Sequence, residues 1–298
     1  MESPRGNSAW PQPEGHVRSR YNIGAGVALA SAVMGAAVWI APSGLVEPDC
    51  SSAASVRPAR DSTEELRLLL NIPAYRLDVI ERGTVTRSIS VAVGQPRYRT
   101  PIGHFQVDYA VWNPWWRPPA SEWARKERPK APGWANPVGR VKLHVTGLVF
   151  LHGTPLEESR GSAASHACVR MSNDDAIALA RLVHGYAGPQ LAPGELDALV
   201  ADTSRTRTII LGRTVPIDIE YRLAEVRSGE LVVYPDPYRR GERGVGGVTA
   251  HIVEALLRER IDTSGLSMQR VRGLVGLSRR APARMAVDSL FSAPDSTR

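Results

Sequence analysis

The sequence predicts a mainly β domain with a few short helices, preceded by one apolar segment long enough to cross a membrane. Residues 75–94 alternate apolar and polar side chains on either side of the turn ERGT, as two half-buried antiparallel strands do. The runs VKLHV, LVFLHG, TIIL, PIDIEY and LVVY are further short strand patterns. From Tyr21 to Val46 no residue is charged, and this is the length of a membrane-spanning helix.

Charges flank this apolar segment unequally. Arg18 and Arg20 precede it, and Glu47 and Asp49 follow it. The positive-inside rule therefore predicts a cytoplasmic tail at 1–20, a single-pass anchor at 21–46 and every later residue outside the cytoplasm, in the cell envelope. A signal segment that is cleaved to give a secreted protein is the alternative, but its apolar region is usually about 7–15 residues long. The longer segment here favours the anchor.

The rest of the chain divides into three parts. Residues 47–62 are small, polar and proline-containing, which indicates a linker. Residues 63–240 hold the strand patterns, a helix expected after Ser172 with Ile177, Ala180 and Val183 as its apolar stripe, and a second helix within 188–202. Residues 241–298 form an extension with an amphipathic helix near 250–260 and a loose tail from Ser278.

The stretch 95–137 is dense in proline and tryptophan and lacks a regular period. Such a stretch is too rich in rings for a flexible linker, so we expect a packed lid or groove wall without regular elements.

Composition and charge limit the partners. The chain is 43% hydrophobic, which suits a packed core, and carries a net charge of +7 with a pI near 9.8. Nucleic acid, a membrane face and an anionic envelope polymer all fit this charge. The sequence has no zinc-finger spacing, phosphate loop or basic run interleaved with aromatics, so we expect no nucleic-acid partner.

Cys168 lies in SHACVRMSNDD, and the only other cysteine is Cys50. A Cys50–Cys168 disulfide, a metal site made by His152, His166 and Cys168, and an inert buried thiol are three alternatives. A nucleophilic thiol would instead need a nearby base, which His152 at the end of an apolar strand could supply. It would also need oxyanion donors, for which the tight segment 165–168 is suited, and Arg170 could bind a substrate carboxylate.

The stretch HGTPLEESRGSAASHACVRMSNDDA resembles the active-site signature of the L,D-transpeptidases, in which a His-Gly pair precedes a Ser-His-Gly-Cys-hydrophobic run that ends in Arg or Asn. The resemblance also includes LRLLLNIPAYRLDVIERGTVTRSISVAVG, RTPIGHF, NPWWRPP, APGWANPVGRVKL and VPIDIEYRLAEVRSGELVVYPDPY. It covers about residues 64–237 in the expected order. The histidine-before-cysteine order also differs from that of papain-like endopeptidases.

The resemblance implies a β-sandwich or barrel catalytic domain that acts on peptidoglycan stem peptides outside the membrane, with no metal and no cofactor. Cys168 would be the nucleophile and His152 the base, oriented by the carbonyl of Gly153. A thioester on Cys168 would pass to an amine of another stem as a 3→3 cross-link, to an amine of an envelope protein, or to water. Four further positions would form the substrate and oxyanion site: Ser165, His166, Ala167 and Arg170.

One residue departs from the family pattern, because Ala167 replaces the glycine before the cysteine. If this position has a positive φ, alanine costs about 1 kcal/mol or more and could disturb the oxyanion donors. The alternative function is therefore a catalytically weakened domain that binds peptidoglycan or scaffolds envelope proteins. For the enzyme, we expect the Cys168 thiol to be the more reactive one, with a pKa below that of a free thiol.

Overall fold

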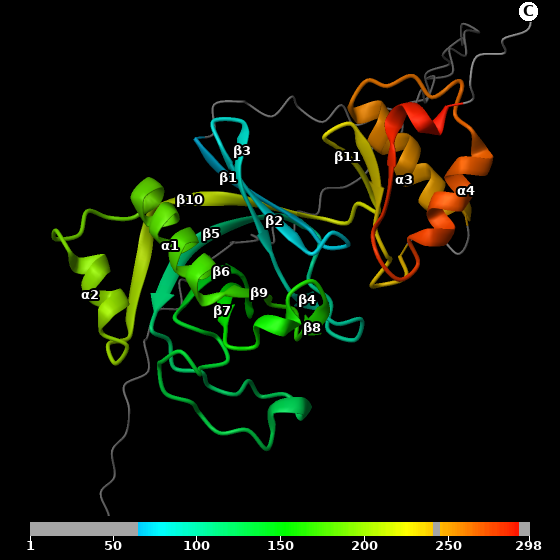
Figure 1. The fold of residues 1–298 in the computed structure, drawn as a ribbon. Coiled ribbons are helices and arrows are strands. Elements are labelled where there is room, and N and C mark those ends of the chain that lie inside the picture. The colour runs from blue at the N-terminus through cyan, green and yellow to red at the C-terminus, as the bar shows by residue number, and fades with distance from the viewer. Residues whose placement is uncertain (1–64, 241–244, 292–298) are drawn as a thin grey trace, which may run out of the picture. The chain divides into compact units, whose positions relative to one another are not determined.

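The structure, a computed structural model, describes residues 65–240 and 245–291. Figure 1 shows its helices and strands. The strands are β1 (Leu66–Asn71), β2 (Arg76–Glu81), β3 (Thr84–Ser90), β4 (Val93–Gly94), β5 (Gly103–Trp112), β6 (Val141–Thr146), β7 (Val149–Thr154), β8 (Ala163–Ser165), β9 (Val169–Ser172), β10 (Arg207–Glu220), β11 (Ala224–Arg227), β12 (Glu230–Val233) and β13 (Ala283–Ala286). The helices are α1 (Asn173–Ala187), α2 (Glu195–Ala201), α3 (Val245–Arg258) and α4 (Met268–Leu277), with 3₁₀ turns η1 (Glu122–Ala124), η2 (Glu157–Ser159) and η3 (Val287–Leu290).

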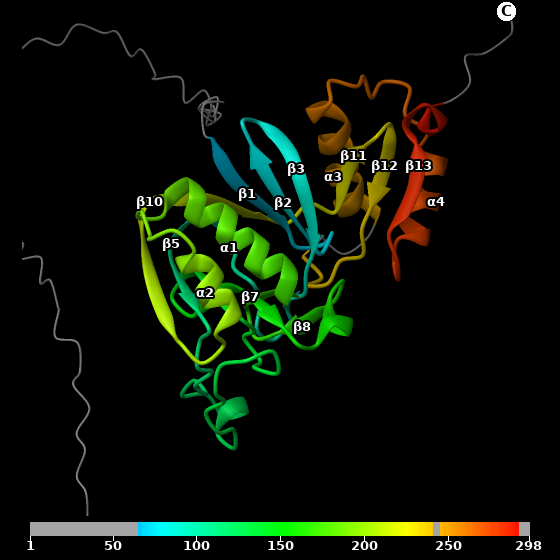
Figure 2. The ribbon, with the colours of Figure 1, turned by 60° about the vertical axis from the view of Figure 1, so that its left-hand side comes forward.

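An eight-stranded sheet forms the main layer, in the order β3-β2-β1-β10-β5-β6-β7-β9. The chain that leaves β3, at one edge, reaches β9 at the other edge, where Ala92 pairs with Arg170. Just beyond, β4 pairs in parallel with β8. These pairings nearly close the sheet into a barrel, and Figure 2 shows α1 lying along it. The prediction of a mainly β, barrel-like domain with few helices is confirmed.

Helix α1 packs against β6, β7 and β10 and completes the main core. Its start follows from local chemistry, because the Ser172 hydroxyl accepts a hydrogen bond from the Asp175 N–H at 3.0 Å, as an N-cap does. Ala180 and Val183 of the predicted apolar stripe are fully buried, and Ile177 is partly buried. The helix thus holds the C-terminal end of β9 against the sheet, and Cys168 immediately precedes the other end of this strand.

Two strand predictions were wrong. Residues 95–137 contain a ten-residue strand, β5, which pairs with β10 on one side and β6 on the other. The runs TIIL and PIDIEY belong to one strand, β10, whose register shifts between Ile210 and Val215. Phe105, Val107, Tyr109 and Val111 alternate with their neighbours and mark β5 within an otherwise irregular segment. β10 pairs with β5 on both sides of its register shift, which makes it one strand.

The C-terminal part has its own core. β12 pairs with β11 on one side and β13 on the other, and α3 and α4 pack on this three-stranded sheet. The predicted loose tail from Ser278 is therefore wrong over 283–291, where β13 extends the sheet and Val287 and Leu290 of η3 are buried. The second core also begins at Ala224, before the boundary expected at 240, because β11 and β12 supply its sheet.

The predicted tail at 1–20, anchor at 21–46, linker at 47–62 and Cys50 all lie outside the described residues. Within 65–240 and 245–291, no helix combines the length and the apolarity that crossing a bilayer requires. The anchor therefore stays a prediction from the sequence.

Asn113 ties the end of β5 to a distant loop. Its Nδ2 lies 2.8 Å from the carbonyl oxygens of Leu199 and Asp202, and its Oδ1 accepts from Arg140 Nε at 2.9 Å. Asn113 is fully buried and has φ +47°, a left-handed conformation that asparagine adopts more readily than most residues. One side chain thus satisfies several buried backbone carbonyls at once.

We predict that Asn113→Ala lowers the free energy of unfolding by about 3 kcal/mol, because it leaves these buried groups without partners. Urea unfolding followed by circular dichroism measures the change. Asn113→Gly removes the same hydrogen bonds and tolerates the positive φ, so it isolates their contribution. Losses below about 1 kcal/mol in both variants would show that Asn113 does not hold the loop.

Candidate active site

The parallel pairing of β7 with β9 brings the histidine and cysteine motifs together. Its register places His152 opposite Arg170 and Leu151 opposite Val169, so Cys168 enters the sheet beside Phe150. Gly153 permits this arrangement, because a Cβ there would lie 2.3 Å from Oδ1 of Asn173 at the start of α1. The His-Gly pair of the sequence is thus explained by close packing.

His152 is buried and held as a neutral base. Its Nδ1 lies 2.6 Å from the carbonyl oxygen of Gly153, which can only accept, so Nδ1 carries the proton and Nε2 is left as the acceptor. Burial is the main cause that lowers the pKa of His152 to about 4, with the charges of Arg170 and Lys142 adding to it and the Gly153 hydrogen bond opposing it. The predicted base and its orienting carbonyl are in contact.

The Cys168 thiol is protonated at rest. Its Sγ lies 3.3 Å from the carbonyl oxygen of Leu148, to which the S–H donates. Burial raises the pKa of Cys168, and a backbone hydrogen bond from Phe150 and the charges of Arg170 and Lys142 lower it by less. The expectation of a pKa below that of a free thiol was therefore wrong, because desolvation exceeds the effect of the cations.

Lys142 is a site residue that the sequence reasoning missed. It pairs with His152 across β6 and β7, and His152 pairs with Arg170 across β7 and β9. Its Nζ lies 4.2 Å from the centre of the Phe150 ring, and its charge acts on both Cys168 and His152. The alternation in VKLHV predicts that Lys142 points to the polar face of its strand. Only the register of β6, β7 and β9 shows that this face carries the site.

Arg170 has no carboxylate partner among the residues that the structure describes, and its Nε is buried without a hydrogen bond. The pKa of Arg170 is lowered by burial and raised in part by Cys168. A guanidinium that lies near the thiol and lacks an internal anion is placed to bind an anionic group of a ligand.

His166 forms part of a wall and does not contact the base. Its ring stacks on Trp123 at 3.8 Å and packs on Tyr98 at 4.7 Å, and its Nε2 lies 3.3 Å from Gln95 Nε2. Trp123 belongs to η1, within the segment predicted to be a lid or groove wall. The segment 95–137 therefore reaches the site through Trp123, a residue that was not among the predicted site residues.

Two hydroxyls hold the backbone around the cysteine. Ser165 Oγ donates to the Cys168 carbonyl oxygen at 2.5 Å, and Thr100 Oγ1 donates to the Ala167 carbonyl oxygen at 2.9 Å. Ala167 has φ +78°, so the alanine occupies the left-handed conformation that a glycine would adopt without strain. The positive φ considered from the sequence is confirmed.

The metal alternative loses its support. Cys168 is a free thiol, and no three His, Cys, Asp or Glu side chains gather as metal ligands within the described parts of the chain. His152, His166 and Cys168 do not gather in the three-ligand arrangement considered above.

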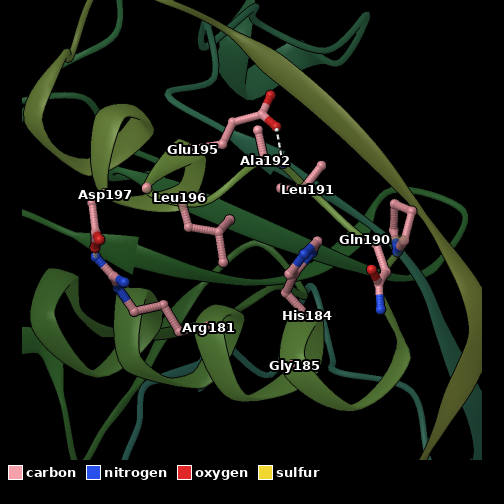
Figure 3. Close-up of a pocket in the computed structure, with 12 residues that line it drawn as sticks. Arg181, His184, Gly185, Gln190, Leu191, Ala192, Glu195, Leu196 and Asp197 are labelled. Carbon is pink, nitrogen blue, oxygen red and sulfur yellow. Dashed lines mark hydrogen bonds and ion pairs between the residues drawn. The ribbon is translucent and has the colours of Figure 1, made fainter.

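A cavity of 460 Å³ lies between the C-terminal half of α1 and the segment that leads into α2 (Figure 3). His184 and Gln190 line it, and Arg181 forms an ion pair with Asp197 at 2.6 Å beside them. None of the predicted site residues lines this cavity. It is separate from the cysteine site and offers no thiol or hydroxyl nucleophile.

We predict that Ala167→Gly raises the melting temperature by a few degrees, because it relieves about 1 kcal/mol of backbone strain. Calorimetry measures the shift, and the reactivity of Cys168 should be preserved or increased. A large loss of reactivity would instead mean that the methyl group is needed to shape the site.

We further predict that alkylation of Cys168 by iodoacetamide follows an apparent pKa above that of glutathione in the same buffer, because burial disfavours the thiolate. Rates between pH 6 and 11, read by mass spectrometry of the Cys168 peptide, give this pKa. Lys142→Met should move the profile to still higher pH, since it removes a positive charge near the sulfur. A wild-type pKa at or below that of glutathione would contradict the structure.

Comparisons with known proteins identify the family of this chain. The family model described as the L,D-transpeptidase catalytic domain matches residues 65–217. The putative L,D-transpeptidase YqjB of Bacillus subtilis is 31% identical over 160 residues, which are 51% of this chain and 84% of YqjB. The probable L,D-transpeptidase YbiS of Escherichia coli K12 is 30% identical over 117 residues, which are 36% of this chain and 38% of YbiS.

Among solved structures, an L,D-transpeptidase from Mycobacterium smegmatis is similar over 52% of this chain and 58% of its own, with 21% identity and a TM-score of 0.32. This chain thus spans less than two thirds of that protein. The family model covers half of the present chain, and it contains every residue of the cysteine site from Thr100 to Arg170. The chain therefore belongs to the L,D-transpeptidase catalytic domain family.

Proposed function

We propose that this L,D-transpeptidase-family enzyme acts on peptidoglycan stem peptides through a thioester on Cys168. The observation that carries the proposal is the parallel pairing of β7 with β9, which brings His152 on β7 near Cys168, the residue that precedes β9. Cys168 offers a thiol, and His152 is a buried neutral imidazole whose Nδ1 is fixed 2.6 Å from the Gly153 carbonyl oxygen. A thiol and an oriented base are what acyl transfer requires.

In the proposed first step, the sulfur of Cys168 attacks the carbonyl carbon of the third stem residue. Nε2 of His152 takes the thiol proton as the C–S bond forms and returns it to the amine of D-alanine as the C–N bond breaks. The carbonyl oxygen becomes an oxyanion that accepts a hydrogen bond from the Cys168 N–H. Free D-alanine leaves, and a thioester remains.

The proposed second step transfers the acyl group. An amine on a second stem gives a 3→3 cross-link, an amine on an envelope protein anchors that protein, and water gives the carboxypeptidase product. In each case His152 accepts a proton from the incoming nucleophile and returns it to the sulfur of Cys168. Arg170, whose guanidinium lacks an internal carboxylate partner, supports binding of the substrate carboxylate.

The proposed location follows from the substrate and the sequence together. Peptidoglycan lies outside the cytoplasmic membrane, and the flanking charges of residues 21–46 orient the chain with its later residues on that side. We therefore infer a single-pass anchored enzyme of the cell envelope, and a secreted form remains the alternative.

A second function has one specific observation in its favour. The φ of +78° at Ala167 is strained for alanine, so the domain could have lost turnover and kept binding of peptidoglycan or scaffolding of envelope proteins. The same substrate experiment separates this binding function from the enzyme.

We predict that Cys168→Ala lowers turnover of a disaccharide-tetrapeptide by about a thousandfold or more, because it removes the nucleophile. Mass spectrometry of protein and products measures this. Wild type should carry an acyl adduct on Cys168 and yield either a dimer lacking one D-alanine or the tripeptide.

Cys50→Ala is the matched control, since it removes the other cysteine and should leave turnover unchanged. Substantial transfer by Cys168→Ala would refute the nucleophile. Binding of the tetrapeptide without turnover by either protein would favour the scaffold instead.

A further inference from the structure

Thr100 lies between the cysteine loop and a tyrosine from beyond the family match. Its Oγ1 donates to the Ala167 carbonyl oxygen at 2.9 Å and accepts from the Gly94 N–H at 2.8 Å. Its own N–H donates to the hydroxyl of Tyr238 at 3.1 Å. That hydroxyl donates to the Gly94 carbonyl oxygen at 2.7 Å. Both hydroxyls thus donate once and accept once.

The Ala167 carbonyl and the Cys168 N–H belong to one peptide unit. A peptide unit is planar and trans, so fixing the direction of its C=O also fixes the direction of its N–H. Ala167 has φ +78°, which a residue with a Cβ does not adopt without support. The hydrogen bond from Thr100 therefore holds the donor that the oxyanion would need.

The support behind Thr100 is rigid. Thr100 and Tyr238 are each 2% exposed. A Cβ on Gly94 would lie 2.1 Å from the Tyr98 carbonyl oxygen, which shows how closely this backbone is packed. The N–H of Tyr238 donates to the hydroxyl of Tyr221 at 2.9 Å, and the two rings stack at 5.5 Å. Thr100 is thus anchored on the side away from the cysteine.

We propose that Thr100, held by Tyr238, is a positioning residue that aims the Cys168 N–H at the oxyanion. This inference rests on the proposed acyl transfer at Cys168. Thr100 touches no reacting atom and acts through the Ala167–Cys168 peptide. Tyr238 lies after residue 217, where the family match ends, so a segment outside that match completes the site of this chain.

Two reactions of Cys168 in the full chain separate positioning from thiol reactivity. With p-nitrophenyl acetate, the sulfur attacks the ester carbonyl and forms a C–S bond while the thiol proton passes to Nε2 of His152. The resulting oxyanion collapses as the C–O bond breaks and p-nitrophenolate leaves. Alkylation by iodoacetamide displaces iodide and forms no oxyanion. Thr100→Val should slow acetylation about tenfold to a hundredfold and leave alkylation within about twofold of wild type.

Three variants complete the test. Thr100→Ser keeps a hydroxyl and should restore acetylation. Tyr238→Phe keeps Thr100 but removes its anchor, and should slow acetylation selectively by about tenfold. Thr86→Val is the matched control, because Thr86 lies on the exposed face of β3 and hydrogen-bonds only Glu81 at 2.6 Å with its hydroxyl; it should change neither rate.

Unchanged acetylation in both Thr100→Val and Tyr238→Phe would overturn the proposal. An equal decline of acetylation and alkylation would also overturn it, since it would place the effect on the thiolate or on the fold. Alkylation without any acetylation of Cys168 in the wild-type chain would overturn it as well, because there would then be no oxyanion site for Thr100 to position. Acetylation by the ester without acylation by the tetrapeptide would refute the proposed substrate and leave the role of Thr100 intact.

Discussion

The parallel pairing of β7 with β9 is the constraint on which the site depends. It sets His152 and Arg170 opposite each other and leaves Cys168 at the point where the chain enters β9. Parallel strands require a crossover connection, and here the cysteine is the last residue of that connection. The peptide units on either side of Cys168 are therefore held by the hydroxyls of Ser165 and Thr100. Within a strand, backbone hydrogen bonds to the neighbouring strand would hold them instead.

Burial sets the electrostatics of this arrangement. Lys142 and Arg170 would favour a thiolate, yet desolvation raises the pKa of Cys168 and lowers that of His152 to about 4. The resting site consequently holds a neutral thiol and a neutral imidazole, unlike the ion pair of a cysteine whose pKa is depressed. In the proposed acyl transfer, proton transfer would therefore accompany attack on the substrate, and the two cations would stabilise the negative charge that develops on the sulfur.

Short-range patterns predicted much of this molecule. Alternation located β2 and β3, the Ser172 cap located α1, and the order of the histidine and cysteine motifs singled out His152 and Cys168 as candidate site residues. The misses have different causes. β5 alternates at Phe105, Val107, Tyr109 and Val111, but it lies within a segment whose prolines and tryptophans obscure that period. β13 is a four-residue strand that is established by its pairing with β12. Lys142, Thr100 and Tyr238 join the site through register and tertiary contact, which spacing along the chain does not reveal.

The strain at Ala167 is understood only with these long-range contacts. A left-handed alanine costs about 1–2 kcal/mol, and a buried hydrogen bond contributes about 1 kcal/mol. The bonds from Thr100 to the Ala167 carbonyl and from Ser165 to the Cys168 carbonyl are thus together comparable to the strain. A glycine reaches the same conformation without such support, but it is also free to leave it. In this chain the conformation of residues 165–168 is therefore set jointly by Ala167 and by the hydrogen bonds from Thr100 and Ser165, since none of these residues specifies it alone.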